Sequence, residues 1–482
     1  MQNEQKMETR TMSASAACCG DPTANAGTGQ CCTSPSPTCG CQSAPDKSTG
    51  LPVAIIGAGP IGLAAAVQLI TKGETPIILE AGDAVGASIR EWAHVRLFSP
   101  WKYLIDPTTR NMLERTGWTM PDADTLPTGG QLVEQLLEPI ARLSQIAPHV
   151  RLSQRVVAIT RRGFDKVKST GREAAPFELV VEDATGRVSR ILARAVIDAS
   201  GTWRSPNPMG AGGVTADGES SLGDNVIYRV PDVRSYDRHR YSGKRVLVVG
   251  SGHSAFNALL DLAGLKTEEP STQIIWAIRR NDIGQMFGGG EKDALEARGA
   301  LGSRLQQLVE SDVVHLEMGI RVARVIREEG GIIVETDEGN KLGPVDEIIV
   351  TTGFRPDLSL ARELRLDLDP WLEAPTQLAP LIDPNVHSCG TVYPHGAAEL
   401  SHPEKDFYVV GMKSYGRAPT FLLLTGYEQV RSIACALVGD EAGAKQVELV
   451  LPETGVCQTD IGGSSCCSVV ESEPELVGLS HR

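Results

Sequence analysis

Two glycine-rich turns, each placed directly after an apolar run, constrain the fold of this chain more than any other feature. The first, GAGPIG at 57–62, follows PVAIIG and precedes the helical pattern PIGLAAAVQLITKG and the strand pattern TPIILEAG. The second, GSGHSA at 250–255, follows RVLVV and precedes a helical pattern and QIIWAIRR. Strand, turn, helix and strand in this order form a βαβ unit with parallel strands. The sequence therefore predicts an α/β protein with two Rossmann-like dinucleotide-binding domains.

The first turn has the spacing of a dinucleotide fingerprint. Gly57 is expected to make the tight turn, Gly59 to let the backbone approach a pyrophosphate, and Gly62 to let the helix pack close to the strand. Pro60 and Ile61 open a helix whose free N–H groups favour phosphate. The alternative is a structural strand–turn–helix with chance glycines.

An acidic residue completes this first pattern. Glu80, followed by Ala81, ends the next predicted strand. Its carboxylate can accept hydrogen bonds from both ribose hydroxyls and would repel a 2′-phosphate. The first site is therefore predicted to bind FAD or NAD rather than NADP.

The second turn differs at its third position and at the end of its second strand. Gly250 and Gly252 repeat the first two glycines, and His253, Ser254 and Ala255 follow instead of a third glycine. The next strand ends in basic rather than acidic residues.

Arg279 and Arg280 are those basic residues. Guanidinium groups can pair bidentately with a 2′-phosphate, which favours NADPH. The alternative is a solvated strand end. Opposite chemistry at the two strand ends suggests that one site holds FAD permanently while the other takes NADPH, which delivers hydride and leaves.

Further motifs make the chain resemble the flavoproteins with two dinucleotide domains, and among them the flavin-containing monooxygenases. These motifs are DASGTW at 198–203, TTGFRPD at 351–357 and YVVGMKSYG at 408–416. The resemblance covers Leu51 to about Leu437. It implies that "DASG" and "TTG" return the chain from inserted elements to the flavin sheet.

The resemblance also implies roles for five more residues in binding FAD. Gly201 would allow close passage by the flavin, Gly411 would lie near the isoalloxazine, and Val156 near the adenine. Arg90 and Trp92 would contact the flavin. Two motifs depart from the family: FxGxxxHxxx(Y/F) is not matched before the second turn, and the expected GG…W reads VGASIREW. A substrate therefore cannot be inherited from the monooxygenases.

These features predict an FAD domain that is split in the sequence by an NADPH domain. The expected segments are a flexible cysteine-rich tail (1–50), the FAD domain (51–225 and 346–442), the NADPH domain (226–345) and an acidic, cysteine-containing tail (443–482). Few large apolar residues in the first tail argue against a packed core there. A helix is expected at Gly130–Ser144, where leucine and isoleucine recur at helical spacing.

The cysteines separate two branches of this group of flavoproteins. Disulfide reductases need two cysteines stacked on the flavin, but this chain has none between Cys41 and Cys389. The resemblance therefore favours chemistry at the flavin itself. In that chemistry the reduced flavin and O2 give a hydroperoxide that oxygenates a soft nucleophile. No catalytic residue has a spacing rule behind it, although Lys413 is a candidate to stabilise negative charge on the reduced ring.

Paired cysteines in the two tails suggest what the nucleophile is. Three thiolates can surround As(III) or Sb(III), which are soft, thiophilic centres. The chain is similar to the flavoproteins of arsenic-resistance operons, which combine such a core with cysteine-rich ends. The alternatives are thiols without a role and the binding of Zn(II) or Cu(I); no structural metal site is predicted. The candidate substrate residues are Cys18, Cys19, Cys31, Cys32, Cys389, Cys466 and Cys467.

Charge and hydropathy limit which partners the protein can have. A formal net charge of −14 argues against nucleic acid as a partner, because an acidic surface repels phosphate. No apolar run is long enough to cross a bilayer, and the start has no secretory h-region. We therefore expect a cytoplasmic protein; the sequence does not indicate an oligomeric state.

Together these features predict an FAD- and NADPH-dependent monooxygenase that uses O2 to convert arsenite to arsenate, or the corresponding antimony species, in metalloid resistance. One alternative is an N- or S-oxygenating monooxygenase of a small organic compound. The other is a metalloid- or metal-binding flavoprotein.

Overall fold

The computed structural model describes residues 50–282, 287, 296–386, 395–418 and 421–448. Contacts divide the chain into Met1–Pro45 and Asp46–Arg482, and every described residue belongs to the second unit. The expectation of a flexible tail at 1–50 thus falls almost wholly outside the described residues. Within the second unit, four sheets are present among the described residues, two of them five-stranded and two three-stranded.

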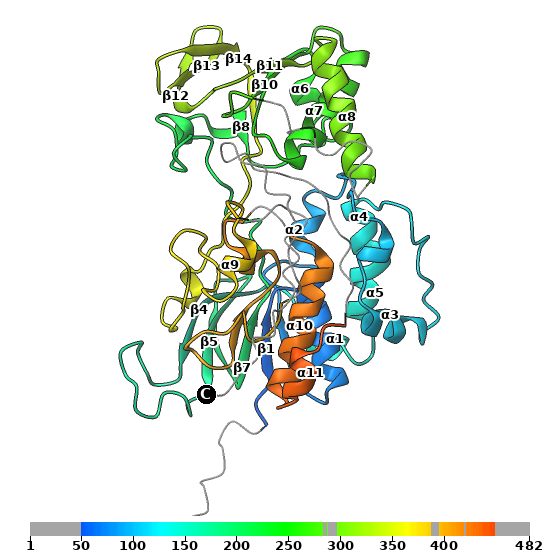
Figure 1. The fold of residues 1–482 in the computed structure, drawn as a ribbon, viewed down its shortest axis with the longest axis vertical. Coiled ribbons are helices and arrows are strands. Elements are labelled where there is room, and N and C mark those ends of the chain that lie inside the picture. The colour runs from blue at the N-terminus through cyan, green and yellow to red at the C-terminus, as the bar shows by residue number, and fades with distance from the viewer. Residues whose placement is uncertain (1–49, 283–286, 288–295, 387–394, 419–420, 449–482) are drawn as a thin grey trace, which may run out of the picture. The chain divides into compact units, whose positions relative to one another are not determined.

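The first five-stranded sheet is parallel and contains the strand before the first glycine turn (Figure 1). Its order is β16 (Phe407–Val409), β7 (Ala195–Asp198), β1 (Val53–Ile56), β2 (Pro76–Leu79) and β3 (Val150–Arg151). β1 pairs with β2 from Val53 opposite Pro76 to Ile56 opposite Leu79. The predicted first βαβ unit is confirmed.

Both faces of this sheet are covered, which explains the uninterrupted apolar run of β1. Val53 and Ile55 face helices α1 (Pro60–Thr71) and α10 (Leu423–Leu437), which lie side by side. Ala54 and Ile56 face the antiparallel sheet on the other side. A strand buried on both faces needs apolar residues at every position, not at alternate ones.

The antiparallel sheet that covers the second face consists of β4 (Gln154–Arg161), β5 (Phe177–Asp183) and β6 (Val188–Ala193). β5 and β6 form an antiparallel hairpin.

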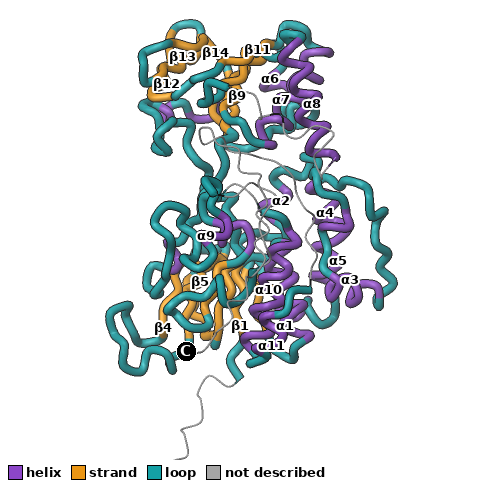
Figure 2. Tube along the Cα trace, viewed as in Figure 1, coloured by secondary structure: helices purple, strands orange, loops and turns teal. Residues whose placement is uncertain are grey.

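The second five-stranded sheet is also parallel and repeats the plan of the first. Figure 2 shows two of its strands, β9 and β11, in orange. Its order is β11 (His315–Glu317), β10 (Gln273–Ala277), β9 (Arg245–Val249), β15 (Glu347–Val350) and β8 (Val226–Ile227). Pairing of β9 with β10 confirms the second βαβ unit.

The second sheet is again covered on both faces. Val246 and Val248 of β9 pack with helices α7 (His253–Glu268) and α8 (Glu296–Glu310), and Leu247 and Val249 pack on the opposite side. That side carries the antiparallel strands β12 (Val322–Glu328), β13 (Gly331–Thr336) and β14 (Lys341–Val345). Five further helices among the described residues are α2 (Ala87–Arg90), α3 (Pro107–Glu114), α6 (Arg238–Tyr241), α9 (Ala379–Ile382) and α11 (Glu441–Lys445).

The helical segment expected at Gly130–Ser144 is present but interrupted by a π turn. It comprises α4 (Gly129–Leu132), the π turn Val133–Leu137 and α5 (Glu138–Arg142). Pro139 has no N–H to donate to the carbonyl of Gln135, one helical turn earlier. The indole of Trp118 donates to that carbonyl instead, at 2.8 Å. The proline in the pattern, with this replacement donor, accounts for the interruption.

Two expected segment boundaries differ from the observed elements. β15 pairs with β9 and β8, so the second sheet extends to Val350 rather than ending at residue 345. The acidic tail expected from residue 443 begins inside α11, which ends at Lys445. α11 is held by Arg431, whose guanidinium donates to the Gly443 carbonyl at 2.8 Å.

Candidate functional site

The first glycine turn has one open position between two closely packed ones. Gly57 has φ +98°, and a Cβ there would lie 2.8 Å from the carbonyl oxygen of Ala199. A Cβ on Gly62 would overlap the Gly57 carbonyl. A Cβ on Gly59 would meet nothing within 4 Å. At Gly57 and Gly62, close packing leaves no room for a side chain. At Gly59 the backbone is accessible, as the binding of a pyrophosphate would require.

Helix α1 begins directly at this turn. Gly59 is its N-cap with extended backbone, and Pro60 takes the first helical position, where its missing N–H is not needed. Ile61 is buried. The N–H groups of the first turn of α1 therefore present partial positive charge beside Gly59.

Glu80 reaches the same turn. Its Oε2 accepts from the backbone N–H of Ala58 at 2.7 Å, and its Oε1 accepts from Gly82 at 2.7 Å. Ala81, between them in the chain, is exposed. The acid at the end of β2 thus lies against the glycine turn, the position from which a carboxylate can bind ribose hydroxyls.

Val156, Gly201 and Gly411 lie on elements that border this turn. Val156 is buried in β4, which starts beside Glu80, since Gln154 N–H donates to the Glu80 carbonyl at 2.7 Å. Gly201, with φ +70°, follows β7 and has open space at its Cβ position. A Cβ on Gly411 would lie 3.2 Å from Ile61 Cγ1.

Arg90 and Trp92 have local partners. Arg90 donates to the Val85 carbonyl at 3.1 Å and pairs with Glu138 at 2.7 Å, and hydrogen bonding to Arg90 is the main reason that the pKa of Glu138 is lowered. The Trp92 ring packs against Gly129, where a Cβ would come within 2.7 Å of it. Their expected contact with the flavin remains a prediction.

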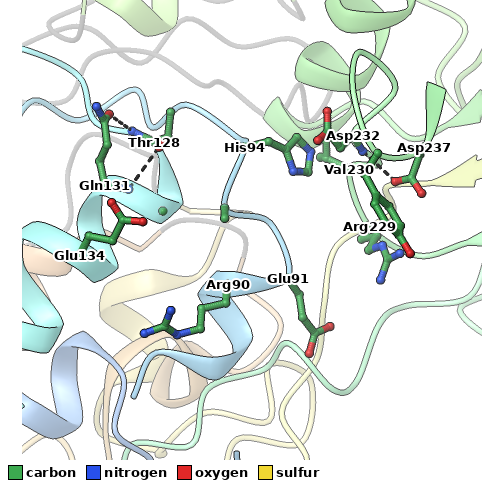
Figure 3. Close-up of a pocket in the computed structure, with 13 residues that line it drawn as sticks. Arg90, Glu91, His94, Thr128, Gln131, Glu134, Arg229, Val230, Asp232 and Asp237 are labelled. Carbon is green, nitrogen blue, oxygen red and sulfur yellow. Dashed lines mark hydrogen bonds between the residues drawn. The ribbon is translucent and has the colours of Figure 1, made fainter. Parts of the chain in front are cut away.

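Arg90 also lines a polar cavity of about 570 Å³ (Figure 3). Figure 3 shows the His94 ring directed toward Val230 and Asp232, while Thr128, Gln131 and Glu134 line another side of the cavity. Thr128 and Gln131 are occupied by the capping box of α4, because each accepts a backbone hydrogen bond from the other.

Lys413, the candidate to stabilise negative charge on the reduced ring, has a buried counter-ion. Its ammonium group is buried and pairs with Asp198 Oδ2 at 2.7 Å, with a further bond to Ser200 Oγ at 3.0 Å. The pair ties the end of β7 to the turn that follows β16, beside Gly201. The role of Lys413 at the reduced ring remains a prediction.

The second glycine turn repeats the geometry of the first at its first two glycines, and an alanine stands in place of the third. Gly250 has φ +132°, and a Cβ there would lie 2.5 Å from the Thr351 carbonyl oxygen. Gly252 has open space at its Cβ position. Ala255 is fully buried at the place of the third glycine, so a methyl group is accommodated in this helix–strand contact.

The residues at the start of α7 differ in surroundings. The His253 ring lies 4.9 Å from that of Phe98 and 5.9 Å from that of Phe256, and Ser254 is exposed. The predicted cofactor residues of this turn are therefore gathered at one helix N-terminus.

Sequence reasoning missed one residue that holds the second turn. The buried indole of Trp276 in β10 donates to the Gly250 carbonyl at 2.7 Å. A tryptophan in an otherwise aliphatic strand is the available signal, because a buried indole N–H needs an acceptor.

Arg279 and Arg280 follow β10 and are exposed. Arg279 Nη1 donates to the carbonyl of Ala211 at 3.1 Å. One guanidinium is therefore already oriented beside the end of β10, and the alternative of a solvated strand end fits Arg280 better than Arg279.

The candidate substrate cysteines lie outside the described residues: Cys18, Cys19, Cys31, Cys32, Cys389, Cys466 and Cys467. Cys435 is buried in α10. Within the described ranges, no three His, Cys, Asp or Glu side chains are grouped so that they could hold a metal ion, and no helix has the length and apolarity to cross a membrane.

Two parallel sheets, each with a glycine turn, define an α/β oxidoreductase built on two dinucleotide-binding units. The chain belongs to the pyridine nucleotide-disulphide oxidoreductase family, whose model matches residues 54–388. Membership confirms the predicted fold class, the oxidoreductase activity and the cofactors FAD and NADP. Which residues bind them remains a proposal.

Three comparisons with individual proteins show the range of relatives. The chain is 26% identical over 376 residues to ferredoxin–NADP reductase 2 of Cupriavidus metallidurans, covering 76% of this chain and 83% of the relative. It is 27% identical over 250 residues to flavin-containing monooxygenase FMO GS-OX-like 2 of Arabidopsis thaliana, covering 47% and 50%. The bacillithiol disulfide reductase structure from Bacillus cereus is 19% identical with a TM-score of 0.59, covering 81% and 99%, and shows the shared fold.

Proposed function

We propose that this protein is an FAD- and NADPH-dependent monooxygenase that oxygenates a soft nucleophile. One observation carries the proposal: a chain with both dinucleotide turns has no cysteine between Cys41 and Cys389. A dithiol relay after the first βαβ unit or in the second unit is therefore impossible. Electrons that arrive at the flavin must leave by another route, and O2 is the acceptor that needs no further protein group.

The residues of the first unit are proposed to hold FAD. The open Gly59 and the first turn of α1 would receive the pyrophosphate, and Glu80 the ribose hydroxyls. Bound FAD supplies the redox chemistry, namely acceptance of hydride and transfer of two electrons to O2. The turn after β16 and the segment after β7 would form the wall near the ring.

The residues of the second unit are proposed to hold NADPH. Gly252 would receive the pyrophosphate, and Arg279 and Arg280 would pair with the 2′-phosphate. Arg279 is already held by the Ala211 carbonyl, so less side-chain entropy is lost when it binds.

Trivalent arsenic or antimony is the proposed substrate. The support is the set of paired cysteines in 1–45 and 457–467, which suit a thiophilic centre, together with the resemblance to flavoproteins of arsenic-resistance operons. One oxygen atom of O2 forms the new As–O bond, and As(III) loses two electrons to give As(V). The other oxygen atom leaves as water with two electrons from NADPH and two protons.

The test is oxygen uptake by the purified protein with NADPH across a panel of substrates. The proposal predicts uptake stimulated by arsenite or antimonite, with arsenate formed in proportion to the NADPH consumed. Stimulation by amines or thioethers alone would assign an N- or S-oxygenating enzyme. A flavin that NADPH cannot reduce would favour a metalloid-binding flavoprotein.

A second candidate is NADPH-dependent reduction of a small iron–sulfur protein. It is favoured by the relative from Cupriavidus metallidurans, which is named a ferredoxin–NADP reductase and aligns over most of this chain. Ferredoxin reduction by NADPH under argon, at a rate above that of oxygen uptake, would select this function. The proposed cytoplasmic location is common to both candidates.

A further inference from the structure

Gln429 is the centre of a buried hydrogen-bond network beside the first glycine turn. It lies in α10 and has no exposed surface. Its Oε1 accepts from the backbone N–H of Gly411 at 2.8 Å, and its Nε2 donates to Ser414 Oγ at 2.9 Å. Nε2 also lies 2.8 Å from His395 Nε2. Ser414 and His395 are themselves buried.

The bonds fix where each proton lies. Ser414 Oγ donates to the Gly411 carbonyl at 2.7 Å, so toward Gln429 it acts as an acceptor. The Gln429 amide then uses one N–H for Ser414 and the other for His395, whose Nε2 must accept. Gln429 thus controls both backbone groups of Gly411, the N–H directly and the carbonyl through Ser414.

The turn that Gln429 controls contacts the first dinucleotide unit. A Cβ on Gly411 would be 3.2 Å from Ile61 in the first turn of α1. The preceding residue, Val410, donates its N–H to the carbonyl of Asp198 at 3.0 Å, and Asp198 lies opposite Ile56 in the sheet. The network is therefore attached to the same end of the sheet as the glycine turn, where β7 and β1 finish.

Helix α10 approaches α1 closely enough to carry this side chain to the turn. At Gly426, a Cβ would lie only 2.5 Å from Ile61 Cδ1, so a larger residue would push the two helices apart. Gly426 precedes Gln429 by about one helical turn, and the two residues therefore share a face of α10.

We propose that Gln429 is a positioning residue of the FAD site, which sets the conformation of the 411–415 turn without touching the cofactor. Loss of its side chain leaves the buried Gly411 N–H without an acceptor and releases Ser414. The turn would then relax away from the conformation in which it borders the flavin. This inference rests on the FAD cofactor of the family and not on the proposed oxygenation reaction.

The test compares three variants in full-length protein. Gln429→Met keeps the volume and removes all polar contacts, and Gln429→Glu keeps the acceptor for Gly411 but loses both donors. Tyr427→Phe is the matched control, because it removes a buried hydrogen bond from the same helix, that of the Tyr427 hydroxyl to the Leu104 carbonyl at 2.6 Å. Flavin affinity is measured by titrating apoprotein with FAD, along with the visible spectrum of the bound flavin and the Tm.

We expect Gln429→Met to weaken FAD binding by roughly tenfold or more and to shift the flavin spectrum. Gln429→Glu should fall between it and the wild type, and Tyr427→Phe should lower the Tm while keeping both flavin readouts. If Gln429→Met does not fold, the comparison of Gln429→Glu with Tyr427→Phe decides. Wild-type affinity and spectrum in the folded Gln429 variants, or equal loss in Tyr427→Phe, would overturn the proposal. Oxygen uptake does not enter this test, so its failure is separate from that of the proposed function.

Discussion

Arg279 and Arg280 are the residues on which the choice between NADPH and NADH rests. Both follow β10 and are exposed, and Arg279 is oriented by the Ala211 carbonyl. We expect Arg279→Ala combined with Arg280→Ala to raise the KM for NADPH roughly a hundredfold or more, since hydrogen bonds to charged groups contribute about 1.5–3 kcal/mol each. The KM for NADH should change little. Equal effects on the two KM values, measured by steady-state kinetics, would remove the 2′-phosphate assignment.

Glu404 is the residue on which a buried ionic cluster depends. Its carboxylate accepts from Arg161 and Arg172 at 2.7 Å each and from the Arg365 backbone N–H at 3.0 Å. Burial alone would raise the pKa of Glu404, but hydrogen bonds from Arg172 and Arg161 outweigh it and the pKa is lowered. Because the folded pKa lies below the ordinary value of 4.5, this stabilisation is present above that pH and is lost as the pH falls through the folded pKa.

Glu404→Gln should therefore destabilise the fold by about 3–5 kcal/mol at neutral pH, because two buried guanidinium groups lose their counter-charge. The substitution should also make the free energy of unfolding depend less on pH in the acid range. Urea unfolding across pH measures both effects. The exposed pair of Arg110 with Glu114 provides the control: Glu114→Gln should change stability by no more than about 1 kcal/mol. Similar losses in the two variants would contradict the buried role.

Single residues divide into those with a sequence signal and those without one. Glu80 could be predicted to reach the first turn because it ends a strand at a fixed place in a known pattern. Lys413 could be selected as a candidate from the sequence, but its ion pair with Asp198 could not be predicted. Asp198 is 215 residues away, and no periodicity in the sequence indicates a contact between two strand ends. Trp276 and Gln429 act on backbone carbonyl and N–H groups, which carry no residue identity in a sequence.

At the scale of elements, the first glycine turn makes opposite demands on two of its glycines. Gly59→Ala should leave the Tm of the apoprotein nearly unchanged, because its Cβ enters open space, but should weaken FAD binding. Gly62→Ala should destabilise the fold itself, because its Cβ would overlap the Gly57 carbonyl. Thermal unfolding and FAD titration separate the two. If Gly59→Ala lowers the Tm of the apoprotein, the Cβ position of Gly59 does not lie in open space, and the argument for cofactor access at Gly59 is contradicted.

Elements were predictable where apolar periodicity was strong. The strands β1 and β9 and the helices that follow them were found at the expected places. The π turn at Val133–Leu137 was not, although Pro139 could have indicated an interruption. The NADPH domain was expected to end at residue 345, one strand before the second sheet ends. The apolar run EIIV of β15 does not indicate which distant strand it pairs with, and in the structure it pairs with β9.

At the scale of the whole molecule, both sheets and both glycine turns lie within residues 50–448, outside the cysteine-rich segment 1–45 in the sequence. Deleting residues 1–45 should therefore leave FAD bound and NADPH oxidation intact. If the segment delivers a metalloid, the KM for arsenite should rise while the KM for NADPH stays the same. Unchanged arsenite kinetics in the truncated protein would show that these thiols do not serve the reaction.

The central claim is that electrons pass from NADPH to the flavin without a cysteine in between. The most direct measurement is the anaerobic reduction of the purified protein by NADPH, followed in the visible absorption band of the flavin before and after alkylation of all accessible thiols. We expect NADPH to bleach the band at the same rate in both samples. A protein that takes up no FAD, or whose reduction by NADPH stops on alkylation, would contradict the account.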